Sequence, residues 1–205
     1  MHVVQRQRAR SNGPVYRVCR RPAFVEGRLC PEVQGHGAAI YDARTDYYKQ
    51  LREFIPKNHR KGGSTRDLLN FAASAAPRKA ANYGSRAGAY ARWWDGRKVK
   101  WTGPRQFAWE SGSVEVSVNP EVVAAFDGVP HAVKLYFKKE HFSVDRANVT
   151  LRLLELAYGG SRSDRVLVVL DLAHDQVFES QESLAALDPY LAGEAASFAA
   201  MVRAL

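Results

Sequence analysis

Apolar residues recur at helical spacing from about residue 45 onward. Tyr47, Leu51 and Phe54 fall on one face of a first predicted helix. Pro56 is expected to end that helix, because proline has no backbone N–H to donate within it. The pattern then predicts a basic loop at Lys57–Gly63.

Two further helices are predicted in the same half of the chain. Ser64 and Thr65 are both candidate N-caps for the second helix, which is expected to end at Pro77. A third helical stretch covers about residues 78–94.

The pattern changes from helical to alternating after the third helix. The clearest signal is a hairpin with strands at Ser113–Phe126 and His131–Lys139, joined by a two-residue turn at Asp127-Gly128. Shorter strands are expected at Arg97–Trp101 and Gln106–Trp109.

The last third of the chain returns to longer elements. A helix is expected to begin after Ser143 and to end at Gly159-Gly160. A buried strand is predicted at Arg165–Leu170 and a shorter one at Gln176–Phe178. Asp188-Pro189 is expected to be the N-cap and first residue of a final helix.

These elements predict an α+β or α/β fold with a central mixed sheet of about four to six strands flanked by helices. The link between residues 139 and 165 is long enough for a crossover helix, so at least one strand pair should be parallel. We expect a basic irregular arm or small module at 1–40 and a single domain at 41–205. That domain should be helical over 41–95, with sheet and helices over 96–205.

Charge is divided unequally along the chain. Residues 1–110 contain 22 Lys and Arg against 8 Asp and Glu, a net charge of +14, and residues 111–205 carry −5. Such a basic half favours a polyanionic partner, and nucleic acid is the first candidate because duplex DNA carries about one negative charge per 1.7 Å. The alternative is a basic face without a specific partner. The basic residues expected to contact DNA or RNA are Arg60, Lys61, Arg78, Lys79, Arg86, Arg92, Arg97 and Lys98.

A membrane protein and a secreted protein are not expected. No apolar run approaches the roughly 18 residues that a membrane span requires, and the basic N-terminus lacks the apolar segment of a secretory signal. The sequence therefore predicts a cytoplasmic protein without a membrane partner.

The third predicted helix combines aromatic and basic residues. Arg86, Tyr90, Arg92, Trp93 and Trp94 could stack nucleic-acid bases and contact phosphates. Tyr90 and Trp94 are four positions apart, however, so we expect both to pack against the sheet. Surface phosphate contacts are expected of the arginines.

The histidines offer weaker candidates. His59 is expected in a solvated loop, from which it could contact phosphate. Asp171, His174 and Asp175 follow the buried strand, a place where α/β proteins often bind ligands. His141 and His174 each neighbour an acidic residue, but the sequence shows no third partner for a metal or catalytic site.

The hairpin brings a carboxylate and a lysine together. A two-residue turn at 127–128 makes paired positions sum to 255, which puts Glu121 opposite Lys134 and Asn119 opposite Tyr136. One interpretation is a cross-strand ion pair, worth about 0–1 kcal/mol if exposed. The other is a metal site, in which a divalent ion lowers the pKa of a water that attacks phosphorus and the lysine stabilises the developing charge.

This segment resembles the PD-(D/E)xK, or restriction-endonuclease-like, superfamily. Its members share an αβββαβ core and a Pro-Asp, a spacer of about ten residues or more, and acid-x-Lys on the next strand. Here Pro120-Glu121 is followed after ten residues by Ala132-Val133-Lys134, and the predicted element order agrees over about residues 64–175. The resemblance implies that Glu121 is the first metal carboxylate and Lys134 the catalytic lysine.

The sequence departs from this motif at Ala132, which occupies the position of the second acid. Some members of the superfamily place that carboxylate on the following helix, where Glu155 could serve here. The resemblance then implies a nuclease with Mg²⁺ held by Glu121 and Glu155. Otherwise the site is inactive, and the fold survives as a binding scaffold.

Three functions follow from these observations. The leading one is a nucleic-acid-binding protein on a nuclease-like scaffold with a degenerate metal site. The second is an active Mg²⁺-dependent nuclease that uses Glu121 and Lys134. The third is a non-enzymatic adaptor or assembly protein, whose acidic C-terminal half docks a basic partner such as a second copy of the chain, forming a homo-oligomer.

Overall fold

The computed structural model describes residues 2–6, 15–19, 46–158, 165–180 and 182–204. The chain divides into two compact units. Unit 1 combines Met1–Asp42 with Gln106–Asn119 and Ala185–Leu205, and unit 2 combines Ala43–Arg105 with Pro120–Leu184. This division differs from the expected one, an arm or small module at 1–40 and a single domain at 41–205. Two segments of the expected domain belong with the N-terminal residues.

Unit 2 contains a five-stranded mixed sheet with the order β3-β6-β7-β8-β9. β7 and β8 are parallel, as the crossover predicted, and each other neighbouring pair is antiparallel. The crossover is α4 (Val144–Tyr158). The strands are β3 (Val99–Trp101), β6 (Val122–Phe126), β7 (Val129–Tyr136), β8 (Val166–Asp171) and β9 (Gln176–Glu179).

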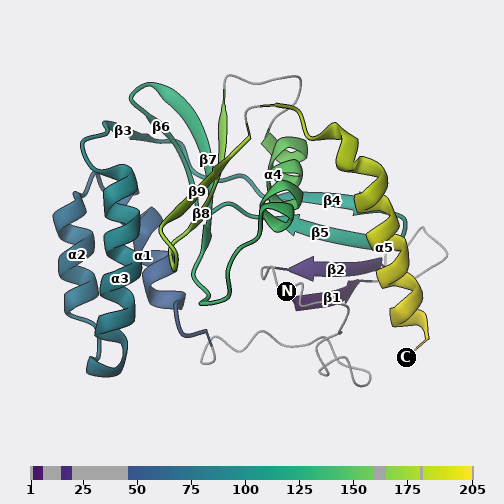
Figure 1. The fold of residues 1–205 in the computed structure, drawn as a ribbon, viewed down its shortest axis with the longest axis horizontal. Coiled ribbons are helices and arrows are strands. Elements are labelled where there is room, and N and C mark those ends of the chain that lie inside the picture. The colour runs from purple at the N-terminus through teal and green to yellow at the C-terminus, as the bar shows by residue number, and fades with distance from the viewer. Residues whose placement is uncertain (1, 7–14, 20–45, 159–164, 181, 205) are drawn as a thin grey trace. The chain divides into compact units, whose positions relative to one another are not determined.

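Helices cover both faces of this sheet, which confirms the predicted fold class (Figure 1). One face packs against α1 (Lys49–Arg60), α2 (Thr65–Ala73) and α3 (Pro77–Trp94). On the other face, α4 contacts β8 and β9. Alternation along the strands assigns each residue to one of these layers. The core of the first layer includes Leu51, Ile55, Leu68, Tyr83, Tyr90, Val122, Phe126, Val133, Leu135, Val168 and Leu170.

Ser64 caps α2 as predicted. Its side chain accepts a hydrogen bond from the Asp67 backbone, and the Asp67 carboxylate accepts one from the Ser64 backbone, which makes a capping box. The hydrogen bonds from Ser64 lower the pKa of the Asp67 carboxyl group. Pro77 lies in the first turn of α3, where a missing N–H costs no helical hydrogen bond.

The predicted end of the first helix at Pro56 is wrong. α1 continues through Pro56 to Arg60, so only the last part of the expected loop at Lys57–Gly63 is non-helical. His59, expected in solvent, is 4 % exposed and its ring packs against Trp94 at a centroid distance of 4.2 Å. Burial of this last turn explains why the helix continues past a residue that removes one of its hydrogen bonds.

The central hairpin has the predicted register. Phe126 pairs with Val129 and Val122 with Val133, and the turn residues Asp127 and Gly128 both have positive φ angles of 50° and 85°. The strand expected at 113–126 is instead divided. It becomes β5 (Val114–Val118) of unit 1 and β6 of unit 2.

Pro120 explains this division. Proline cannot donate to a strand ladder, so it is disfavoured in the interior of a central strand. The β6–β7 pairing ends at Val122 and Val133, and it does not include the expected pair of Asn119 with Tyr136. The Glu121 N–H still donates to the Val133 carbonyl at 3.1 Å.

Unit 1 contains a four-stranded sheet with the order β1-β2-β5-β4. It comprises β1 (His2–Arg6), β2 (Val15–Cys19), β4 (Phe107–Ser111) and β5, with β2 parallel to β5. Two parts of the expected irregular arm are thus strands, and the rest of 1–40 lies outside the described residues. Gly159-Gly160, the expected end of the fourth helix, also lies outside them.

The last helix packs on this second sheet. After a short 3₁₀ turn, η1 (Ala185–Leu187), α5 (Asp188–Arg203) places Ala195 and Ala199 against Val114. Leu187 rather than Asp188 is the N-cap, so Asp188 and Pro189 lie inside the first turn. Among the described helices, none is both long and apolar enough to cross a membrane.

Burial of His59 should make stability depend on pH. Burial lowers the pKa of His59 from 6.5 to about 4. The unfolded chain therefore binds more protons below pH 6.5, and the free energy of unfolding should fall by roughly 3 kcal/mol as the pH drops from about 6.5 to 4. Urea denaturation at several pH values would measure this loss.

The matched control is His59→Gln. His131, whose pKa is also lowered by burial, contributes to the pH dependence in the same direction in both proteins. The wild-type protein should therefore lose more stability on acidification than the variant. Parallel pH profiles for the two proteins would contradict a neutral, buried His59.

Candidate functional site

Glu121 and Lys134 are brought together as the sequence predicted. Glu121 immediately precedes β6, and Lys134 lies in the middle of β7. Val133 belongs to the core under α1–α3, so alternation directs Lys134 to the opposite face of the sheet, the face of α4. The Lys134 Nζ atom lies 2.8 Å from Glu121 Oε1.

The Glu121 carboxylate has a second donor. Its Oε2 atom accepts a hydrogen bond from the Leu135 backbone N–H at 2.9 Å, so both oxygens bind β7. The side chains of Glu121 and Lys134 are only 13 % and 16 % exposed. This ion pair is therefore largely withdrawn from water, whereas the value of about 0–1 kcal/mol given from the sequence applies to an exposed pair.

The position of the missing second acid is closed to solvent. Ala132 is fully buried in the sheet, where it pairs with Val123 and Leu167 on the two neighbouring strands. A carboxylate in this place would have to lose its hydration between apolar neighbours, which is costly without a charged partner. Glu121 therefore has no acidic neighbour at the motif position.

Glu155, the candidate replacement, binds other groups. Its Oε1 accepts a hydrogen bond from Ser183, and its Oε2 accepts bonds from the Leu184 backbone and the Arg152 guanidinium at 3.1 and 2.8 Å. Burial raises the pKa of the Glu155 carboxyl, but these three donors outweigh burial and lower it overall. The contacts attach the C-terminal half of α4 to the segment after β9.

A resident Mg²⁺ does not fit these residues well. Glu121 would have to exchange its bonds to β7, and Glu155 its bonds to Arg152 and the segment after β9. Within the described residues there is no group of three or more His, Cys, Asp or Glu side chains that could hold a metal ion. What the pair does in this arrangement is to join the start of β6 to β7.

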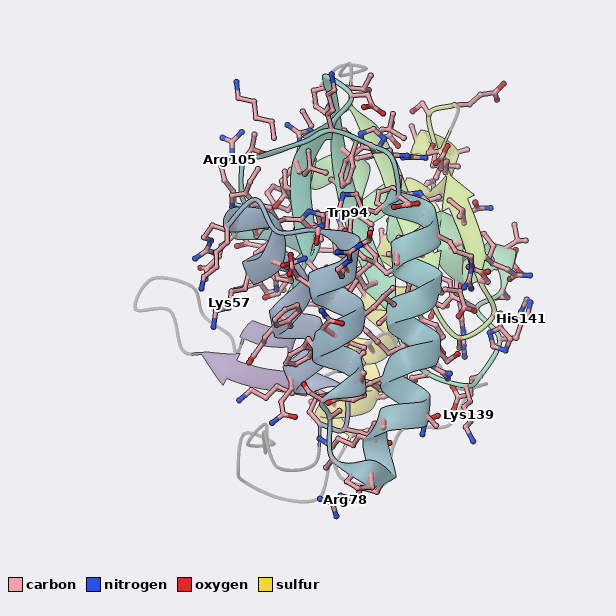
Figure 2. The ribbon with its side chains drawn as sticks, turned by 90° about the vertical axis from the view of Figure 1, so that its left-hand side faces the viewer. Lys57, Arg78, Trp94, Arg105, Lys139 and His141 are labelled. Atoms are coloured by element: carbon pink, nitrogen blue, oxygen red, sulfur yellow. The ribbon has the colours of Figure 1, made fainter. Side chains whose placement is uncertain are left out.

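A second candidate site is the basic layer, which we define as residues 46–105 of unit 2. It contains 14 Lys and Arg against 4 Asp and Glu, a net charge of +10. Figure 2 shows Lys57, Arg78 and Arg105 at the margin of this layer, while Trp94 lies among the helices. The exposed Lys and Arg residues of the layer are Lys57, Arg60, Lys61, Arg66, Arg78, Arg92, Lys98, Lys100 and Arg105.

Few carboxylates neutralise this layer. Its ion pairs in the described part of the chain join Lys49 to Glu53, Arg52 to Asp46, and Arg92 to Asp175. Arg92 donates from both Nε and Nη2 to one Asp175 oxygen, at 3.0 and 2.7 Å. Most of the exposed positive charge is thus left for solvent or for a partner.

The predicted contact residues fall into three groups. Arg60, Lys61, Arg78, Arg92 and Lys98 are exposed, as a surface contact requires. Lys79 and Arg97 are half-buried, and each cation lies over an aromatic ring, within 5.3 Å of the Tyr47 centroid and 4.7 Å of the Trp93 centroid respectively.

Arg86 does not lie on the surface. It is 7 % exposed, its guanidinium stands over the Tyr48 ring, and its Nε atom is buried without a hydrogen-bond partner. The expectation of a surface phosphate contact at Arg86 is therefore wrong. Arginine spacing on a helix does not reveal which face packs against the aromatic residues.

The aromatic residues of α3 pack as expected. Tyr90 and Trp94 are 0 % and 5 % exposed and belong to the core. The Tyr90 hydroxyl lies 2.7 Å from the His59 Nε2 atom, a contact that the sequence did not suggest. Four exposed bases, Lys57, Arg66, Lys100 and Arg105, were also missed as candidates, although the overall charge count includes them.

The burial of the Glu121–Lys134 pair predicts how substitutions in it change the stability of the protein. Glu121→Gln removes the carboxylate charge that lies against the Lys134 ammonium, and we expect the free energy of unfolding to fall by about 2–3 kcal/mol. The double variant Glu121→Gln/Lys134→Met should recover part of this loss. Chemical denaturation of the wild-type protein, the single variants Glu121→Gln and Lys134→Met, and the double variant would measure the coupling energy between the two side chains.

Lys49 and Glu53 offer the matched control, because their side chains are exposed and 3.9 Å apart. Glu53→Gln should change stability by no more than about 0.5 kcal/mol. Equal effects of Glu53→Gln and Glu121→Gln would show that the central pair is no stronger than a surface contact.

Comparisons with protein-family models, with curated proteins and with solved structures found no match to this chain. The resemblance to the PD-(D/E)xK superfamily therefore rests on its short motif and on the order of its elements.

Proposed function

We propose that this chain is a nucleic-acid-binding protein and that the basic layer of unit 2 is its contact surface. The observation that carries the proposal is the net charge of +10 over residues 46–105, with nine exposed Lys and Arg side chains. Positive charge of this density favours a polyanion, because each phosphate contact releases condensed counterions.

The spread of the charge favours an extended ligand over a single phosphate group. α3 has 18 residues, so it is about 27 Å long, a length comparable to roughly eight base pairs of duplex. Arg78 lies in its first turn, whereas Arg92 lies in its last turn and Lys98 follows its end. A surface of this length matches a nucleic-acid backbone better than a small anion.

The scaffold proposed for this surface is nuclease-like. In unit 2 the order α3-β3-β6-β7-α4-β8 is the αβββαβ order that the sequence resemblance implies. Glu121 and Lys134 stand on neighbouring strands of that core, in contact. The buried Ala132 and the occupied Glu155 favour a binding scaffold over an active enzyme.

Binding should depend steeply on salt. The logarithm of the association constant for duplex DNA should fall by about 0.9 for each phosphate contact per decade of salt. Replacing two exposed bases with Lys61→Gln/Lys98→Gln should reduce this slope by up to about 2. Fluorescence anisotropy at several salt concentrations, with DNA and RNA probes, would measure it.

Arg146→Gln/Arg203→Gln is the control, because it removes the same charge from α4 and α5 rather than from the basic layer. Its slope should stay close to that of the wild-type protein. An equal decrease of the slope in both double variants would show that nucleic acid binds elsewhere, or that binding depends only on the net charge of the protein. Binding that is insensitive to salt would contradict the proposal.

The second candidate function is a Mg²⁺-dependent nuclease, favoured by the 2.8 Å contact between Glu121 and Lys134. It is the weaker candidate, because the carboxylates that would hold the metal bind other groups. We expect no cleavage of DNA or RNA with Mg²⁺ or Mn²⁺. Cleavage by the wild-type protein that Lys134→Ala abolishes, at unchanged binding, would establish the enzyme instead.

A further inference from the structure

A group of polar side chains lies at the carboxyl end of the parallel strands β7 and β8, and its residues belong to neither site described above. β8 ends at Asp171, and His174 follows in the turn before β9. His141 follows the end of β7, in the segment that leads to α4. The carboxyl ends of parallel strands are where open α/β sheets commonly bind ligands.

Asp171 organises this group. It is 1 % exposed, and its Oδ1 accepts hydrogen bonds from the Ala173 and His174 backbones at 3.0 and 3.3 Å. Its Oδ2 accepts one from the Phe142 backbone at 3.2 Å and lies 2.8 Å from His174 Nδ1. One buried carboxylate therefore holds both the residue after His141 and the ring of His174.

The contact with Asp171 decides which nitrogen of His174 is available. A carboxylate accepts and cannot donate, so the proton is on Nδ1 and the neutral ring carries its lone pair on Nε2. The His174 side chain is 33 % exposed, which allows a ligand to approach it. A carboxylate behind a histidine in this way is the usual support of a metal-binding imidazole.

His141 supplies a second imidazole at a suitable distance. Its ring centroid lies 5.3 Å from that of His174, with 51° between the ring planes. Two imidazoles bound to one tetrahedral metal, with metal–nitrogen bonds of about 2.1 Å, have their centroids about 5 Å apart. His141 is exposed, and Figure 2 shows it at the right-hand edge of the molecule in that view.

We propose that His141 and His174 bind a divalent transition-metal ion, with Asp171 as the positioning residue behind His174. Imidazole ligands favour Zn²⁺, Ni²⁺ or Cu²⁺ over Mg²⁺ and Ca²⁺. The described residues supply two ligands, because the adjacent Asp175 is bound by Arg92. Water or an oxygen of a bound molecule completes the coordination, which leaves the ion open to a ligand. This proposal is independent of nucleic-acid binding.

The test is calorimetric titration of the full chain with Zn²⁺ and with Ni²⁺, in excess Mg²⁺. We expect one ion to bind per chain. His141→Gln and His174→Gln should each weaken binding at least tenfold. Both substitutions lie at accessible side chains, so the variants should remain folded, and circular dichroism would verify it.

Two further variants distinguish this site from other metal ligands in the chain. Asp171→Asn should weaken binding by about 10–100-fold while retaining one ion per chain, as loss of a supporting carboxylate does. Asp175→Asn should leave affinity unchanged within about twofold, since Asp175 is no ligand here. No binding of Zn²⁺ or Ni²⁺, or binding that neither histidine substitution weakens, would overturn the proposal.

Discussion

The pairing of β6 with β7 is the interaction on which the rest of unit 2 depends. It aligns Val122 with Val133, so the residues of both strands alternate in step between the two faces of the sheet. One face then receives the helices of the basic layer, and the other receives α4. A shift by one residue would exchange these faces and bury Lys134 under α1–α3. The Glu121 carboxylate, bound to Lys134 and to the Leu135 backbone, opposes such a shift.

The same geometry explains why the basic layer is a surface. The apolar residues of α1, α2 and α3 are used to cover the sheet, so most of the bases between them face outward. Only one of the fourteen, Arg86, is buried, and it lies against an aromatic ring instead of a carboxylate. Positive charge collects on the outside of this layer because its acidic residues are few.

The Glu121–Lys134 contact shows how a catalytic motif and a structural contact can share the same residues. Cross-strand proximity of an acid and a lysine is required by both. The surrounding residues distinguish the two. Here they are Ala132, which is buried, and Glu155, which is hydrogen-bonded to Ser183 and Leu184. A metal site needs oxygen atoms that are free to leave their hydrogen bonds.

The sequence by itself determined several features of this protein: the capped second helix, the hairpin with its Asp127-Gly128 turn and register, the parallel crossover and the basic first half. The cap and the hairpin depend on neighbouring residues, the crossover on the length of the link between two strands, and the charge on composition, all of which a single chain displays directly. Only the tertiary structure decided that α1 continues past Pro56, that Pro120 separates two sheets, that His59 and Arg86 are buried, and that His141 lies beside His174. These depend on packing between residues distant in sequence, and packing energy outweighs local preference where a side chain leaves water.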